Sequence, residues 1–312
     1  MKKIFLCAAL MTAAVINASD VIIYANPFVT EESTQLNNVE QGIPAVLWTN
    51  TQSVMAGSAP AIPITNANQL QIQNKKAAGS QGRNMLTAPI ANFNAPFTSK
   101  LSEIASDSIV WTFCFRNNNQ YSSKGLDSTY NGNAIILLAD QANLLTANGY
   151  AIIMGDENSS KTIKFASFSG GLTTNANATY LLASPVVTLK KYWHIRVVYI
   201  PSSNTWKLGY YENLEGFIEP DDCTWTDCGS IVNDTYTNTT MSHFGFLNKY
   251  SNNNDNILYV KNYKIMAYGV AETPTGIDNF NTCTPSRKVL RDGQLIILRE
   301  GMEYNVLGQS IL

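Results

Sequence analysis

Lys190 to Ile200 reads KKYWHIRVVYI, Pro201 to Thr205 reads PSSNT, and Trp206 to Glu212 reads WKLGYYE. The outer two runs are rich in β-branched and aromatic residues, and the turn between them carries Pro, Ser and Asn. This is the pattern of a β-hairpin with a longer loop. At a period of two, the first run places its residues on two faces, one of Trp193, Ile195, Val197 and Tyr199 and one of His194, Arg196 and Val198. The stretch predicts a strand that buries one side, in a fold built on such strands.

Similar patterns recur along the chain at short intervals. Ile109 to Arg116 alternates at period two and predicts a central strand, whereas Ala134 to Ala139 is apolar throughout and predicts a strand buried on both faces. Leu70 to Gln73 alternates like an edge strand, and residues 215–240 read as a loop. Further strands are expected at Val21–Tyr24, Pro44–Trp48, Gly149–Gly155, Thr162–Phe168, Tyr180–Leu189, His243–Asn248 and Ile257–Ile265. Short strands with few helical stretches predict one all-β, two-sheet antiparallel sandwich over residues 19–270.

The composition excludes some classes of function. Charged residues make up 14% of the chain and the formal net charge is -2, so neither a nucleic-acid footprint nor a strongly acidic surface is present. Polarity is carried instead by Asn, Thr and Ser. Such amide and hydroxyl surfaces suit an extracellular protein that meets neutral partners such as sugars, although the same residues are also good turn formers.

The first eighteen residues have the pattern of a secretory signal peptide. Lys2 and Lys3 form the positive region, Ile4 to Ile16 is apolar, and Ala18 is a small residue after which we expect cleavage. Cys7 lies inside the apolar stretch and reads as part of the discarded peptide rather than as a lipid-modified cysteine. No later stretch approaches the ~20 apolar residues of a membrane helix. We therefore expect a protein that is secreted or held at the outer surface.

Four cysteines follow the signal peptide: Cys114, Cys223, Cys228 and Cys283. Cys223 and Cys228 are separated by a short loop sequence, and an exported chain can keep disulfides, so a local bridge between them is the preferred assignment. Cys114 lies in an apolar strand and reads as a packed core thiol. A zinc site is not supported, because the two histidines are far from this pair in the sequence.

Several of these segments together resemble a known family. Trp111-Thr112-Phe113, Gly149-Tyr150-Ala151-Ile152-Ile153, the hairpin from Tyr192 to Leu208, and Asn256 to Tyr263 resemble concanavalin A-like lectin/glucanase sandwiches. More narrowly, they look like the laminin-G-like jelly-roll modules of secreted Bacteroidetes proteins. The resemblance implies a jelly-roll sandwich. It also implies that a structural calcium is an option, with Asp127, Asp140, Asp156 and Asp255 as candidate ligands near turns, while no cofactor is required.

The end of the chain differs in character. Residues 271–287 read as a linker, and residues 288–312 read as strand, Gly-containing turn and strand. This segment looks like the C-terminal sorting tails of Bacteroidetes surface proteins. The resemblance implies that the tail engages protein export machinery.

Catalytic patterns are weak. Glycosidases need two carboxylates at a defined separation, and laminarinase-type relatives place them as Glu-x-Asp-x-x-Glu on one strand, a pattern that this sequence lacks. The nearest acidic cluster lacks this spacing and reads as a solvated loop; it consists of Glu212, Glu215, Glu219, Asp221 and Asp222. His194 reads as a structural histidine, and no nucleophile elbow accompanies His243.

Sugar binding has more support in the sequence. Loop aromatics beside Asn and Asp can stack on sugar rings while the polar groups bind hydroxyls. The candidate ligand-binding residues are Trp225, Tyr121, Tyr130, Tyr236, Tyr250 and Asp127, with Trp225 preferred because the small loop gives it little reason to pack in a core. We therefore predict a non-catalytic carbohydrate-binding or adhesion module. The alternatives are a glycan-active hydrolase or lyase of the same fold and a surface protein that binds another protein or has a structural role; the oligomeric state is open.

Overall fold

The computed structural model describes residues 18–73, 80–117, 126, 132–154, 162–188, 191–251, 257–271, 287–291, 294–299, 302–305, 309 and 311. These residues fall into two compact units, one up to residue 271 and one from residue 272 onward. The described helices are single 3-10 turns, η1 (Leu101–Glu103), η2 (Asn175–Asn177), η3 (Pro201–Ser203) and η4 (Pro220–Asp222). None of them is long or apolar enough to cross a bilayer.

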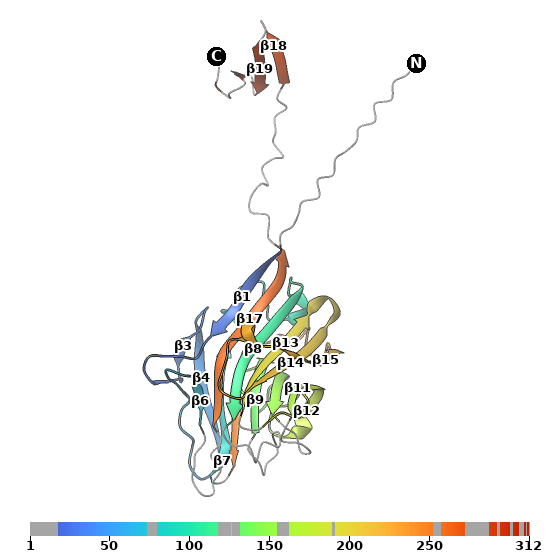
Figure 1. Ribbon diagram of the computed structural model, residues 1–312. Helices are drawn as coiled ribbons and strands as arrows, with labels where there is room; N and C mark the ends of the chain where they lie inside the picture. The colour runs from blue at the N-terminus through green and yellow to red at the C-terminus, as the bar shows by residue number, and fades with distance from the viewer. Residues whose placement is uncertain are drawn as a thin grey trace. The chain divides into compact units, whose positions relative to one another are not determined.

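Two antiparallel sheets make up the described part of the first unit (Figure 1). The nine-stranded sheet contains β1 (Ala18–Asn26), β2 (Thr34–Gln35), β5 (Ile64–Thr65), β6 (Leu70–Ile72), β8 (Ser108–Asn117), β13 (Tyr192–Ile200), β14 (Thr205–Asn213), β15 (Thr226–Val232) and β17 (Leu258–Ala271). Its order is β15-β14-β13-β8-β17-β6-β5-β2, and β1 also pairs with β17. The hairpin predicted from the sequence is β13–β14, and Asn204 closes its turn in the left-handed conformation at φ 49°.

The eight-stranded sheet faces it across the core. It contains β3 (Val39–Gln41), β4 (Val46–Ala56), β7 (Gln81–Pro89), β9 (Gly132–Ala139), β10 (Gly149–Met154), β11 (Ile163–Phe168), β12 (Ala178–Ala183) and β16 (His243–Ser251). Its order is β12-β11-β10-β9-β16-β7-β4-β3. In the second unit, β18 (Arg287–Arg291), β19 (Gln294–Arg299) and β20 (Met302–Tyr304) form a small sheet of their own.

Aromatic side chains fill the space between the two sheets. Trp206 of β14 lies 4.5 Å from Tyr150 of β10 and 4.9 Å from Phe165 of β11, measured between ring centroids. Trp206 also lies 4.6 Å from Tyr199 on its own sheet. Such offset and tilted pairs contribute about 0.5–1.5 kcal/mol each beyond the burial of their area. Aromatic side chains at alternate positions of β13 and β14 therefore stabilise the packing of one sheet against the other.

A second buried cluster lies on the other face of the eight-stranded sheet. Neighbouring residues of β9 divide between the two cores, since Ile135 joins the core between the sheets and Ile136 joins the second cluster. Small side chains such as Ala134 and Ala151 leave room there, and Leu144 and Leu172 from connecting loops fill it. The uninterrupted apolar run at Ala134–Ala139 is thus buried on both faces, as predicted. This face of the sandwich is occupied by the chain's own loops.

The predicted all-β sandwich with two antiparallel sheets and a small C-terminal β tail is confirmed. Several details differ, among them the short strands β2, β3 and β5, which the sequence pattern does not predict. The segment Leu70–Ile72 is not an edge strand, because it pairs with both β17 and β5. The expected loop over residues 215–240 contains β15, and β7 was not anticipated at all.

Candidate functional site

A long connection, residues 214–225 and called the flap here, crosses the outer face of the nine-stranded sheet. The backbone N–H of Ile218 donates to Nε2 of His194 on β13 at 3.0 Å, and the Ile218 carbonyl lies 3.5 Å from Sγ of Cys114 on β8. Farther along, Nδ2 of Asn262 on β17 donates to Oε1 of Glu219 at 2.9 Å. The flap therefore spans three neighbouring strands before it returns to β15.

Cys114 and His194 lie directly opposite each other beneath the flap. Both are fully buried. Burial raises the pKa of the Cys114 thiol and lowers the pKa of the His194 imidazole, so both groups are neutral near pH 7. Since Nε2 of His194 accepts a hydrogen bond, its single proton lies on Nδ1. The pair has the residue types of a nucleophilic dyad, but its protonation and burial make it structural.

Among the described residues, Ser242 and His243 form a second pair of a possible nucleophile with a histidine. The hydroxyl of Ser242 donates to the Asp140 carbonyl at 2.6 Å and also lies 2.8 Å from Nδ1 of His243. A hydroxyl has one hydrogen, so Ser242 must accept from Nδ1–H of His243. The imidazole is therefore oriented against taking the serine proton, which argues against a nucleophilic serine.

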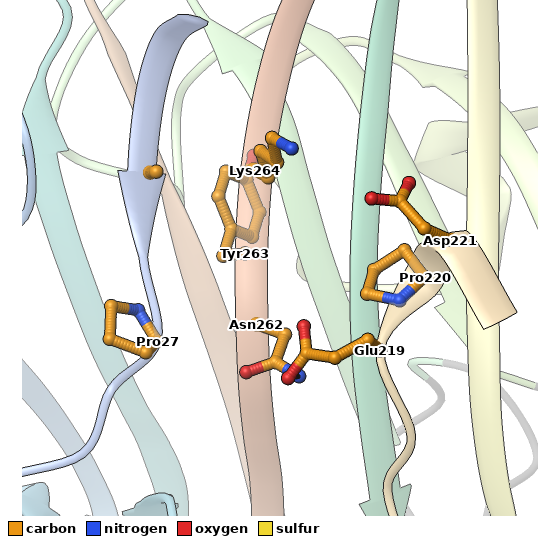
Figure 2. Close-up of a pocket in the computed structure, with 8 residues that line it drawn as sticks. Pro27, Glu219, Pro220, Asp221, Asn262, Tyr263 and Lys264 are labelled. Carbon is orange, nitrogen blue, oxygen red and sulfur yellow. Dashed lines mark hydrogen bonds between the residues drawn. The ribbon is translucent and has the colours of Figure 1, made fainter.

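One pocket opens between the flap and a β-bulge in β17, and we call it the bulge pocket. Figure 2 shows the carboxylates of Glu219 and Asp221 reaching from the flap side toward Asn262 and Lys264. Asn262 has a left-handed backbone, φ 53°, at the register shift between Lys261 and Lys264. The cavity measures about 160 Å³. Small-ligand sites typically measure ~300–1,000 Å³, so this pocket is too small to enclose a sugar ring.

A second pocket, called the Trp225 pocket, lies where the flap joins β15. Its volume is about 280 Å³, close to the lower end of the range for small-ligand sites, and so suits one sugar ring. Its lining residues come from the hairpin, the flap and β15: Arg196, Val198, Lys207, Leu208, Gly209, Trp225 and Asp227. Of the five tryptophans, Trp48, Trp111, Trp193 and Trp206 are fully buried, whereas Trp225 is partly exposed.

Strand register explains how the Trp225 pocket is built. Gly209 of β14 lies opposite Arg196 of β13 on one side and opposite Asp227 of β15 on the other. Arg196 and Asp227 therefore flank the glycine at about 10 Å from each other, two strand spacings. Lys207 precedes Gly209 by two residues and so shares its face. The result is a bare patch of strand backbone with an indole beside it and charged groups on two sides.

The fold itself does not require a glycine at position 209. Its φ is not positive, and a Cβ built there would meet no atom closer than 3.6 Å, the carbonyl oxygen of Thr226. Glycine inside a strand weakens the strand and often marks a place where a ligand approaches the backbone. Packing would therefore tolerate a side chain at position 209, and the glycine leaves the strand backbone uncovered in the pocket.

The predicted binding residues lie in different parts of the structure, and not all of them are accessible to a ligand. Trp225 lines a pocket, and its role in ligand binding stays a prediction, whereas Tyr250 is 1% exposed within β16, so its assignment to a ligand-binding loop is wrong. Tyr236 is half-buried and packs edge-on against Tyr150, with ring centroids 5.7 Å apart. It does not line the Trp225 pocket. Tyr121, Tyr130 and Asp127 lie outside the described residues.

The predicted disulfide is not formed, since Cys223 and Cys228 are both free thiols. Cys228 packs toward the core between the sheets, whereas Cys223 lies on the flap near Cys114, whose pKa it helps to raise. The two side chains therefore point to opposite sides of the sheet. Burial raises the pKa of each thiol to about 11, which also disfavours the thiolate that oxidation needs.

The calcium prediction finds no preformed cluster among the described residues, in which no group of three or more His, Cys, Asp or Glu side chains could hold a metal. Both carboxylate oxygens of Asp140 accept hydrogen bonds from Asn148, at 2.9 and 2.7 Å. Asp156 and Asp255 lie outside the described residues.

Arg196, Lys207, Asp227 and Gly209 were not anticipated as site residues. A signal for them existed, because the hairpin register that aligns the two strands also places Arg196 opposite Gly209. The sequence pattern predicts a loop where the structure has β15, so it does not place Asp227. The pocket thus depends on a strand pairing that the sequence pattern does not reveal.

No protein-family model and no curated protein sequence matches this chain. Among solved structures, it is similar to peanut lectin, with 13% identity, 80% of this chain and 98% of the lectin covered, and a TM-score of 0.42. It is similar to lectin II from Ulex europaeus at 11% identity, with 75% and 98% covered and a TM-score of 0.42. The catalytic domain of a glycoside hydrolase family 131 protein from Coprinopsis cinerea shares 13% identity, with 63% and 69% covered and a TM-score of 0.38. No functional conclusion follows from likenesses at these scores.

Proposed function

We propose that this chain is an exported carbohydrate-binding protein whose sugar site is the Trp225 pocket. The observation that carries the proposal is the pairing of the partly exposed indole of Trp225 with the bare backbone at Gly209. A sugar ring has an apolar face that stacks on an aromatic ring and hydroxyls that need polar partners. The pocket offers both, since Arg196 and Asp227 flank its floor.

Binding to a broad glycan panel, measured with the full chain, tests this proposal. We expect Trp225→Ala to weaken binding at least tenfold through the loss of the stacking surface, about 1.4 kcal/mol. Gly209→Ala should do the same, because its methyl group raises the floor on which the ring rests. The matched control is Gly216→Ala on the flap, where a built Cβ meets nothing within 4 Å. Unchanged binding by both pocket variants would overturn the proposal.

A reducing-sugar assay on each bound glycan separates binding from hydrolysis. The alternative of a glycan-active hydrolase rests on Glu219 and Asp221, which line one cavity, since glycosidases act with paired carboxylates. We expect no released sugar. Product that disappears in Glu219→Gln would replace the binding proposal with the hydrolase, and silence across the panel would favour a protein partner.

Export is the second part of the proposal. It is supported by the signal-peptide pattern of residues 1–18 and by the sorting-like tail from residue 288. Cell fractionation followed by N-terminal sequencing should find a mature protein that begins at Ser19 outside the cytoplasm. An intact Met1 in the cytoplasm would refute this part without touching the sugar site.

A further inference from the structure

The charges of the Trp225 pocket narrow the class of sugar. Two cations, Arg196 and Lys207, line it against one carboxylate, Asp227. Within the described residues, neither cation has an ion pair or a side-chain hydrogen bond. One oxygen of Asp227 already accepts the backbone N–H of Gly229 at 2.8 Å. The pocket therefore holds five guanidinium and three ammonium donor hydrogens without a matching acceptor.

The placement of these charges is as informative as their number. Arg196 and Asp227 lie on opposite sides of Gly209, so a ring resting on the floor meets a cation at one edge and a carboxylate at the other. Lys207 lies on the same face, two residues along β14. A neutral sugar would satisfy Asp227 with a hydroxyl but would leave the two cations facing only hydroxyl oxygens. An anionic group at the opposite edge would satisfy them with charge-assisted hydrogen bonds.

Other charges lie close enough to matter. Burial raises the pKa of Tyr268, Arg196 lowers it, and Asp20 and Asp221 raise it further. Arg196 therefore acts electrostatically on Tyr268 as well as lining the pocket. Asp20 and Asp221 act on the same tyrosine, so the charges near Arg196 include two carboxylates besides that of Asp227.

We propose that the Trp225 pocket takes an acidic sugar, whose anionic group is bound by Arg196 and Lys207 and whose hydroxyls donate to Asp227. This inference rests on the proposed sugar site. The anionic group is either a uronic acid carboxylate or a sulfate ester. Arg196 can bind either with two parallel N–H groups, and its planar fork matches a carboxylate especially well.

Calorimetric titration of the full chain with three matched oligosaccharides tests the proposal. They are a uronic acid oligosaccharide, its carboxyl-reduced neutral counterpart, and a sulfated oligosaccharide of similar length. We expect an acidic ligand to bind at least tenfold more tightly than the neutral one, with the preference weakened at high salt. Comparison of the uronate and the sulfate shows which anion is preferred.

Substitutions identify which side chains bind the anionic group of the sugar. Arg196→Gln should reduce the preference for the acidic ligand to less than threefold while leaving the affinity for the neutral counterpart within twofold of the parent. Lys207→Gln should weaken acidic binding alone, and Lys288→Gln, an exposed cation in the second unit, controls for net charge. Equal Trp225-dependent affinity for neutral and acidic ligands would overturn this inference and leave the sugar site standing. Acidic binding that survives both pocket variants would also overturn it, whereas no binding to any of the three would count against the sugar site itself.

Discussion

His194 lies on the outer face of β13, fully buried, with Cys114 opposite it and the flap above it. The residue was expected to be structural, and its contacts explain why. Nε2 accepts the Ile218 N–H, and the ring lies 5.7 Å from that of Tyr211 and 6.3 Å from that of Phe217. A proton added to this ring would place a charge among apolar groups, so burial lowers the pKa of His194.

This lowered pKa predicts a loss of stability in mild acid. The unfolded histidine takes up a proton as the pH falls below about 6.5, whereas the folded one resists, so stability is full above that pH and falls toward the folded pKa. Each unit of difference between the two values is worth about 1.4 kcal/mol. His194→Gln keeps an acceptor for Ile218 and removes the titration, so its free energy of unfolding should vary less between pH 7.5 and 5.5. Urea unfolding at three pH values measures this.

The second histidine supplies the control. Burial also lowers the pKa of His243, so His243→Gln should remove the remainder of the same pH dependence and the double variant should be nearly flat in this range. A His194→Gln curve parallel to that of the parent would contradict the assignment.

Residue types favour one residue of the candidate site. Trp225 was singled out because its local sequence offers no core to pack into, and it does line a pocket. Similar polar neighbours favour Tyr250 in the sequence, yet Tyr250 lies within β16 and is 1% exposed. Composition around an aromatic residue therefore does not distinguish a loop from a strand end.

The flap covers Cys114 on the outer face of the nine-stranded sheet. Phe217 anchors it by an edge-on contact with Tyr192, with ring centroids 4.8 Å apart. Phe217→Ala should loosen the flap and let reagents reach the Cys114 thiol. We expect at least a tenfold faster alkylation of Cys114, corresponding to about 1.4 kcal/mol of easier opening. Site-resolved mass spectrometry reads this rate, and Leu214→Ala, at a 60% exposed flap position, should leave it unchanged. Equal rates in the parent and in Phe217→Ala would show that the flap does not protect the thiol.

Because loop residues are buried in the second cluster, we predict that the loops on the eight-stranded sheet contribute to the free energy of unfolding. Leu172 comes from a connecting loop but is fully buried among strand residues. Leu172→Ala should lower the free energy of unfolding by about 2–5 kcal/mol, as for a core leucine. Val186→Ala, at a 68% exposed position, should change it by less than about 0.5 kcal/mol. A Leu172→Ala effect as small as that of the control would mean that the loop is only resting on the sheet.

Strands with a strong pattern were predictable, and the others were not. β8 and β13 carry large apolar side chains at a period of two, and Ala134–Ala139 of β9 is apolar throughout, so period and run length suffice to identify them. β7 carries Gly82, Arg83 and Asn84 and ends at Pro89, so it has no period of two, although it pairs with β4 and β16 along its length. Pairing with β4 and β16 makes this segment a strand, and its local sequence pattern does not predict that pairing.

At the scale of the whole molecule, the two outer faces of the sandwich differ. The chain's own loops cover the outer face of the eight-stranded sheet with a second core, whereas the flap crosses the nine-stranded sheet and leaves pockets beside it. The Trp225 pocket is built on the nine-stranded sheet, where the hairpin also supplies Arg196, Lys207 and Gly209.

The last prediction concerns the boundary after Ala271. The sandwich is closed by β1 and β17, whose pairing runs from Asn26 with Tyr263 to Ala18 with Ala271. The described strands of the second unit pair only with one another. A chain ending at Ala271 should therefore unfold cooperatively at a Tm within about 2 °C of the full chain, since a loss of 1 kcal/mol would shift Tm by about 2–4 °C at this size. A chain ending at Ile265 is the contrasting variant, because it removes the end of β17 that pairs with both β1 and β8, and its Tm should fall well beyond that limit. Differential scanning calorimetry measures both, and a drop of more than 5 °C for the chain ending at Ala271 would show that residues 272–312 contribute to the stability of the sandwich.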